Sequence, residues 1–220
     1  MTAVVITVNG QAEEFHPPQR ATAQVQLGLH GKAKQEVAAQ IRELAHRVAA
    51  DIADRHDPDR GPITWYSQSA PATWAEKPWN KDGKQLPVVH HARIVFQVKF
   101  ADFSVLAGWI DDWAEVAGIS LTGIEWTLTE AHQQSVSERV RAAAVGAARA
   151  KAQAYADSLE LGPVHPVALA DSGLLAPGLV SVHPAAASFR SRGAGDATPA
   201  GIIPEDVPVQ ASVDARFETG

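Results

Sequence analysis

Apolar and polar residues alternate with a period of two in several stretches of the chain, as expected for strands that bury one face. The alternation is clearest at residues 21–29, where alanine, valine and leucine take every second position. The same pattern predicts strands over residues 4–8, 93–100, 121–129 and 209–217, a strand that starts at 63, and a short extended segment over 164–169. Together these segments predict a sheet with one apolar face.

Three other stretches repeat their apolar residues every three or four positions, which predicts helices. The first covers residues 32–56 and the second 104–117. We expect the third to start at a capping box formed by Ser135 and Glu138 and to end before Pro163. One face of this helix carries a stripe of small side chains, namely Val136, Val140, Ala143, Ala147, Ala150 and Ala154. Because such a stripe allows close approach, we expect the helix to pack on its own sheet rather than to form a helix–helix seam.

The elements follow one another in the order β-β-α-β-β-α-β-α-β-β. This order predicts an α+β fold in which an antiparallel or mixed sheet is covered on one face by three helices. We expect residues 1–220 to form a single domain. Residues 171–206 are rich in Ala, Gly, Ser and Pro and lack periodicity, which predicts a long flexible loop. A C-terminal strand over 207–218 then returns to the sheet, whose open face and edges are suited to self-association.

The composition excludes several kinds of site. The chain has no cysteine, so disulfides, thiolate metal ligands and cysteine nucleophiles are excluded. Its 19 Lys and Arg against 25 Asp and Glu give a net charge of −6, which argues against nucleic acid or an anionic membrane as a partner. No apolar run approaches the roughly 20 residues of a membrane span, and the first residues lack the features of a signal peptide. We therefore expect no membrane span and a cytoplasmic location.

Candidate catalytic and metal-binding residues form no recognisable motif. His90 and His91 are adjacent, but neighbouring residues on a strand point to opposite faces and do not readily share a metal ion. Asp111 and Asp112 lie beside the apolar face of a predicted helix, where we expect them to be solvated. The serines lack the Gly-x-Ser-x-Gly context of an activated nucleophile, and the glycines form no phosphate loop. We therefore predict no catalytic residue, no cofactor and no metal, and we expect that the protein is not an enzyme.

The connection that follows the strand starting at 63 is polar and contains proline, yet it holds two tryptophans among lysines. Indoles beside cations can bind sugars, peptides or another subunit, whereas packing onto their own domain is the alternative. We expect this loop to lie at or near an interface. The candidate interface or ligand contacts are Trp74, Trp79, His90, His91 and Arg93.

Several pieces of the chain occur together in one known family. They are the opening Ile6-Thr-Val-Asn-Gly10, the strand 21–29, the Gly118-Ile119 and Gly123-Ile124 step, the helix 147–154, and the closing strand 209–217. In this order and spacing the chain resembles the SIMPL domain family, a bacterial group of unknown biochemistry. The resemblance implies an α+β body that assembles into oligomers, and it suggests a link to oxidative-stress defence.

Two hypotheses of function follow. The first is a non-enzymatic, oligomer-forming SIMPL-like protein that acts as a stress-associated scaffold or binding module, with copies of itself or another protein as partner. The alternative is a small-molecule or metal-binding protein, or an enzyme, whose pocket lies near His90, His91, Arg93 and the loop of Trp74 and Trp79.

Overall fold

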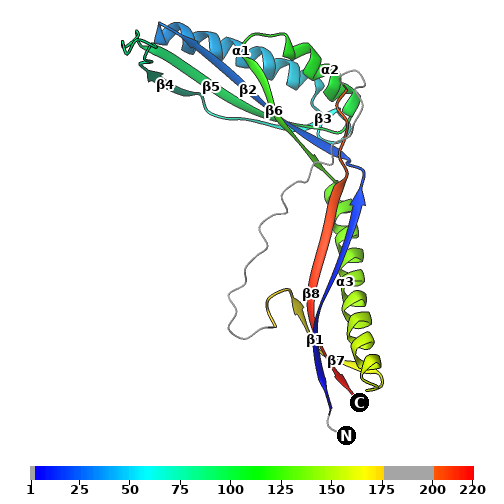
Figure 1. Cartoon of the computed structure of the whole chain (residues 1–220). Helices are drawn as coiled ribbons and strands as arrows, with labels where there is room; N and C mark the ends of the chain where they lie inside the picture. The colour runs from blue at the N-terminus through cyan, green and yellow to red at the C-terminus, as the bar shows by residue number, and fades with distance from the viewer. Residues whose placement is uncertain (1–2, 176–200) are drawn as a thin grey trace. The chain divides into compact units, whose positions relative to one another are not determined.

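The computed structural model of the chain describes residues 3–175 and 201–220. The chain divides into two compact units, each built from segments that are separated in the sequence. Residues 18–127 and 201–205 form the α1–α2 unit, and the α3 unit combines the described residues 3–17, 128–175 and 206–220. Figure 1 shows the helices and strands of both units.

The α1–α2 unit contains a five-stranded antiparallel sheet and two helices (Figure 1). Its strands are β2 (Arg20–Gly31), β3 (Ile63–Gln68), β4 (Ala72–Glu76), β5 (Val89–Phe100) and β6 (Ile119–Thr127). Strands β3, β5, β2 and β6 lie side by side in that order, and β4 also pairs with β5. The helices are α1 (Lys34–Arg55) and α2 (Phe103–Ala114).

The core of this unit lies between one face of the sheet and the two helices. Ala92, Ile94, Phe96, Val98 and Phe100 of β5 are buried, and the residues between them are half-buried or exposed. The alternating residues of β2 and the apolar stripe of α1 complete the same core. The opposite sheet face, which carries the odd-numbered residues of β5, is called the helix-free face below.

Helix α2 begins at a side-chain cap. The Asp102 carboxylate accepts hydrogen bonds from the backbone N–H groups of Ser104 and Val105, and from the Ser104 hydroxyl. These donors hold the pKa of Asp102 below its usual range. The helix is followed by Gly118, which has a φ of +87° and therefore takes a conformation that favours glycine. The cap and this glycine fix where the chain leaves the sheet and returns to it as β6.

The α3 unit has a three-stranded antiparallel sheet covered by one long helix (Figure 1). Strand β8 (Val207–Thr219) lies between β1 (Val5–His16) and β7 (Val164–Asp171), and the helix is α3 (Glu130–Ser158). The apolar core of the unit consists of Ile6 and Val8 of β1, Leu128 before α3, Val164 of β7, alternate residues of β8, and the buried residues of α3.

Helix α3 lies unusually close to β1. A Cβ atom on Gly10 would stand 2.2 Å from the Ala144 carbonyl oxygen and 2.6 Å from the Ala148 Cβ, which no side chain could tolerate. The buried residues of α3 recur every fourth position, as Val136, Val140, Ala144, Ala148, Ala152 and Ala156. The predicted stripe therefore has the right first two members, but Ala143, Ala147, Ala150 and Ala154 lie outside the buried row.

The predicted α+β class is confirmed, with three helices, antiparallel strands and a C-terminal strand in the part of the chain that the structure describes. The strands form two sheets, and the helices divide two to one between them. Helix α3 starts at Glu130, with Thr129 at its N-cap, so the capping box predicted at Ser135 was wrong. The single domain over residues 1–220 stays a prediction.

Of the predicted loop 171–206, residues 176–200 lie outside the described residues. The strand predicted over 207–218 is present as β8 and pairs with β1 along its whole length. Among the described residues, no helix has both the length and the apolar character needed to cross a lipid bilayer.

Candidate functional site

Three rings lie in one row across the helix-free face. The strand register places Trp74 of β4 opposite His91 of β5, and His91 opposite His30 of β2. The Trp74 indole stacks on the His91 imidazole with a centroid distance of 5.1 Å and an interplanar angle of 7°. The His30 ring follows at 5.8 Å and is tilted by 32°. This row is the first candidate site.

Two charged side chains flank the row. The Arg93 guanidinium lies 5.9 Å from the centre of the Trp74 ring, within the range of a cation–π contact. The Oε1 atom of Glu76 lies 3.2 Å from His91 Nε2. That nitrogen is inaccessible to solvent and makes no hydrogen bond, because its geometry toward Glu76 is not that of one. The buried Nε2 of His91 therefore has an acceptor close by without a bond to it.

The structure brings together only part of the predicted set. Trp74, His91 and Arg93 converge. His90 belongs to the alternate positions of β5 and takes part in no ring contact or ion pair among those described, but it lines a cleft together with Trp74 and His91. Trp79 lies in the loop after β4, where its backbone bridges to Gln85, and its side chain is 67% exposed. The role of these residues as interface or ligand contacts stays a prediction.

A small cleft lies between β4, β5 and the first turn of α1. Lys34, Thr73 and His90 supply polar groups to it, and Val37, Ala38 and Ala92 are among its apolar lining residues. Its volume of about 150 Å³ is below the roughly 300–1,000 Å³ of sites that enclose a drug-sized ligand. The cleft can therefore accept at most a compact molecule.

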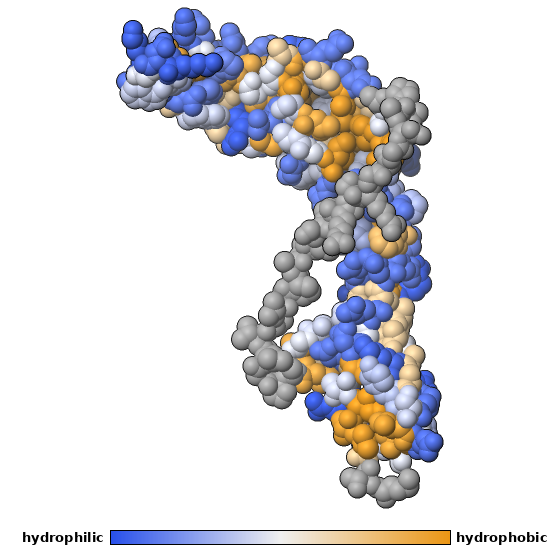
Figure 2. Space-filling model, in the orientation of Figure 1, coloured by the Kyte–Doolittle hydropathy of each residue, from blue (hydrophilic) through white to orange (hydrophobic). Residues whose placement is uncertain are grey.

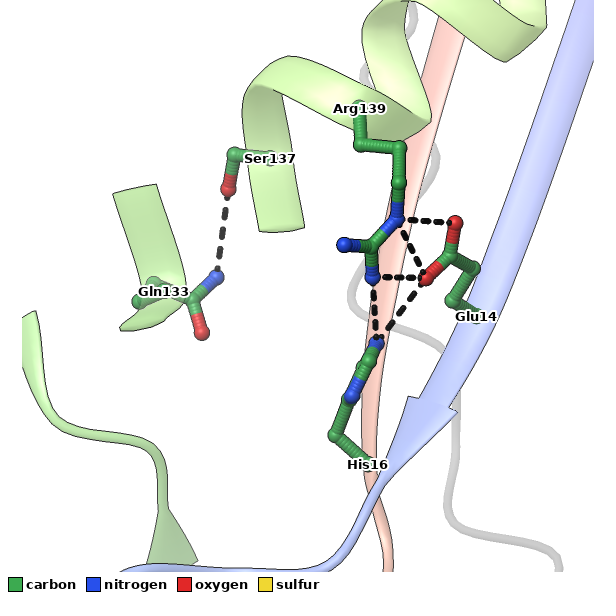
Figure 3. A network of polar contacts seen from close by, with 5 residues as sticks. All are labelled: Glu14, His16, Gln133, Ser137 and Arg139. Atoms are coloured by element: carbon green, nitrogen blue, oxygen red, sulfur yellow. Dashed lines mark hydrogen bonds and ion pairs between the residues drawn. The ribbon is translucent and has the colours of Figure 1, made fainter. Parts of the chain in front are cut away.

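A second polar cluster lies in the α3 unit (Figure 3). The Arg139 guanidinium on α3 donates from Nε to Glu14 Oε1 at 3.0 Å and from Nη2 to Glu14 Oε2 at 2.5 Å. His16, two residues along β1 on the same face, places its Nε2 3.0 Å from Glu14 Oε2. The hydrogen bonds from Arg139, and then that with His16, lower the pKa of Glu14 to about 2. The cluster joins the end of β1 to α3.

Neighbouring groups complete the cluster without adding a reactive centre. The His132 ring meets that of His16 edge to face at 5.3 Å, and Gln133 makes a 3.5 Å contact with Ser137 one turn along α3 (Figure 3). Glu14 keeps its charge down to low pH and is bound to a permanent cation, so it cannot serve as a base that exchanges protons near neutrality. We interpret this cluster as a structural tie.

The sequence contained a signal for this cluster that was missed. Glu14 and His16 are two residues apart on a strand, and this spacing puts their side chains on one face. Glu13 also lies within β1, but as the neighbour of Glu14 on a strand it points to the opposite face. Only the tertiary structure shows that Arg139 faces them, because this residue is more than a hundred positions away in the chain.

Within residues 3–175 and 201–220, no group of three or more His, Cys, Asp or Glu side chains is arranged to hold a metal ion. The prediction of no metal rests on ligand spacing in the sequence, and it stays a prediction.

No curated protein matches the chain at a significant level. The family model described as SIMPL, a protein of unknown function (DUF541), matches residues 6–217. This match covers the strands and helices named above except the first residue of β1 and the last two of β8, so the chain belongs to the SIMPL family.

Proposed function

We propose that this protein is a non-enzymatic binding module that associates with copies of itself. The observation that carries the proposal is the free edge of β6. Strand β6 pairs with β2 on one side, and no described strand pairs with it on the other. An unpaired edge offers a row of backbone donors and acceptors to another strand unless something guards it.

The edge of β6 has little protection. Across its nine residues the only charged side chain is that of Glu125, and the strand contains no proline. The apolar residue Leu121 is 40% exposed, because α2 leaves part of this strand uncovered. Figure 2 shows apolar surface on the α1–α2 unit where α2 and β6 meet. Edges of this kind favour association with a partner strand.

The sequence of β6 is compatible with pairing to itself. Strand β6 carries a bulge at Thr122, where its register to β2 shifts. An antiparallel pair of two β6 strands, related by a two-fold axis near Thr122 and Gly123, would place Leu121 opposite Ile124 and Ile119 opposite Trp126. All four side chains lie on the helix-covered side of the sheet in register with buried residues of β2. Such a pair matches apolar with apolar residues and has the symmetry of common homodimers.

Three carboxylates of the protein are already bound by other groups of the fold, and this supports a non-enzymatic role. Glu14 is bound by Arg139, and Asp102 caps α2. Asp51 of α1 accepts hydrogen bonds from Arg55 and from two indoles of α2. General acid–base catalysis needs a group that is free to gain and lose a proton beside a substrate, and these three carboxylates are occupied.

Light scattering of the full chain tests the proposal. We expect a mass above that of one chain at micromolar concentration, and a lower mass for Leu121→Lys, which places a charge beside the edge. Ile203→Lys is a matched control, because Ile203 is 77% exposed in the same unit but lies outside both β6 and the loop of Trp79. A wild-type chain that stays monomeric would refute self-association. An oligomer that withstands Leu121→Lys, with unchanged thermal stability, would refute the β6 interface.

The second candidate function, a small-molecule-binding protein, is favoured by the cleft beside His90 and Thr73. Because its volume is about 150 Å³, the candidates are compact metabolites or anions. A thermal-shift screen of such compounds against the wild type and His90→Ala tests it. A stress-associated role is an extension of the first proposal that rests on the family resemblance alone.

A further inference from the structure

The buried nitrogen of His91 is the most informative feature of the helix-free face. Its side chain is only 22% exposed, and its Nε2 atom has neither solvent nor a hydrogen-bond partner. A buried polar atom without a partner normally lowers the stability of a fold. The Glu76 carboxylate is 3.2 Å away, so a small reorientation would let a protonated Nε2 donate to it.

The strand that supplies Glu76 is weakly held. Strand β4 has five residues, follows Pro71, and is exposed along its whole length. It pairs with β5 on one side, and its Trp74 stacks on His91 of that strand. Elements with little buried surface open before the rest of a fold. The attachment of β4 therefore depends strongly on the state of His91.

We propose that β4 is a pH-responsive clasp, which is held to β5 more tightly when His91 carries a proton. The protonated imidazolium would attract the Glu76 carboxylate and would stack as a cation on the Trp74 indole. The neutral ring leaves both contacts weaker. Acid favours the imidazolium form of a histidine, so the clasp tightens as the pH falls.

Other charged groups around His91 determine how strongly its protonation changes the attachment of β4 to β5. Arg93, on the same strand, lies over the Trp74 ring and opposes a second cation there. His30, from β2, lies 5.8 Å from His91, and its own protonation would oppose that of His91. Glu76 is the carboxylate that favours the charged form. Because Glu76 is 57% exposed, solvent screens this attraction, and we expect about a twofold to fivefold change in the opening equilibrium.

Release of β4 would have two local consequences. Thr73 and Ala75 line the cleft beside α1, so the departure of β4 would open that cleft. It would also expose the edge of β5 from Val89 to Arg93, with which β4 pairs. The clasp thus controls access to a small cleft and to a sheet edge. This inference does not depend on the association proposed through β6.

Amide hydrogen exchange of the full chain at pH 5.5 and 7.5 tests the clasp, after correction for the intrinsic exchange rates. We expect amides of β4 and of Val89–Arg93 to be about twofold to fivefold more protected at pH 5.5. Glu76→Gln should remove most of this difference, and His91→Phe, which keeps a stacked ring, should remove all of it. His30→Gln should enlarge it.

Glu125→Gln is the matched control, because Glu125 is an exposed carboxylate in the same sheet, far from His91 in register. It should keep the wild-type difference. Equal protection of β4 at the two pH values in the wild type would overturn the proposal. So would a pH difference that survives in both Glu76→Gln and His91→Phe.

Discussion

The indole Nε1 of Trp109 on α2 donates a hydrogen bond to Asp51 Oδ2 on α1, with the two atoms 2.6 Å apart. The Trp113 indole donates to the same oxygen at 3.1 Å, and Arg55 donates to the other carboxylate oxygen. Trp109 is only 1% exposed, so its N–H group has no access to water. One carboxylate therefore satisfies both indoles and fixes the position of α2 beside α1.

Removal of this carboxylate should destabilise the α1–α2 unit. In Asp51→Ala the buried Trp109 N–H would lose its acceptor, which typically costs about 1–3 kcal/mol. Asp54→Ala is the control, because Asp54 lies on the same helix and is exposed. Urea unfolding of the two variants should show a reduced midpoint for Asp51→Ala alone. Equal midpoints would mean that water or another group replaces the carboxylate.

The strands and the first two helices could be predicted because their signals are local. A period of two or of 3.6 identifies an element without reference to its partners, as in residues 21–29 and the stripe of α1. Pairing is not local. The division of the strands into two sheets depends on the antiparallel pairing of β1 with β8, whose residues are about two hundred positions apart.

The face of α3 that packs on the sheet could not be predicted, because the sequence of this helix is too uniform. Alanine occupies both the buried row and the positions next to it, as in the pairs Ala143 and Ala144, and Ala147 and Ala148. Gly10 on β1 decides which of these rows faces the sheet, because the backbone of α3 approaches the sheet at this glycine. The Trp74–His91 stack was missed for a similar reason: β4 is short, and its register to β5 arises only in the folded sheet.

A side chain at Gly10 should disturb the α3 unit. The Cβ of Gly10→Ala would clash with the Ala144 carbonyl, a backbone atom that cannot turn aside, and overpacking of this kind costs about 1–3 kcal/mol. Gly146→Ala is the control, because a Cβ there meets nothing within 4 Å. It should stabilise the exposed helix by about 0.5–1 kcal/mol. Helix loss followed by circular dichroism in urea would separate the two, and equal stability would refute the close contact.

Substitution within α3 provides an independent check of its phase. Ala148→Leu adds volume to a fully buried position and should destabilise the unit by about 1–3 kcal/mol. Ala147→Leu, which the predicted stripe would have made equally harmful, changes an exposed position. It should stay within about 0.5 kcal/mol of the wild type. Thermal unfolding of the two variants side by side decides which row faces the sheet.

The Glu14–Arg139 pair should give a pH-dependent contribution to stability. The pKa of Glu14 falls from 4.5 to about 2 on folding, so its charge stabilises the fold above pH 4.5. That contribution is lost as the pH falls from 4.5 toward 2. Glu14→Gln should therefore melt below the wild type at pH 7, and the difference should shrink by pH 3. Glu218→Gln, an exposed change on β8, is the control. A difference that stays constant with pH would contradict the assignment.

The two tryptophans of the β4 region should behave differently when they are truncated. Trp74 stacks on His91 and lies beside Arg93, and such contacts contribute about 0.5–1.5 kcal/mol. Trp79 is 67% exposed, so Trp79→Ala should change the stability of one chain by less than about 0.5 kcal/mol. We expect Trp74→Ala to lower the melting temperature and Trp79→Ala to act only on association. If the double variant matches the wild type in both light-scattering mass and melting temperature, this region is not part of an interface.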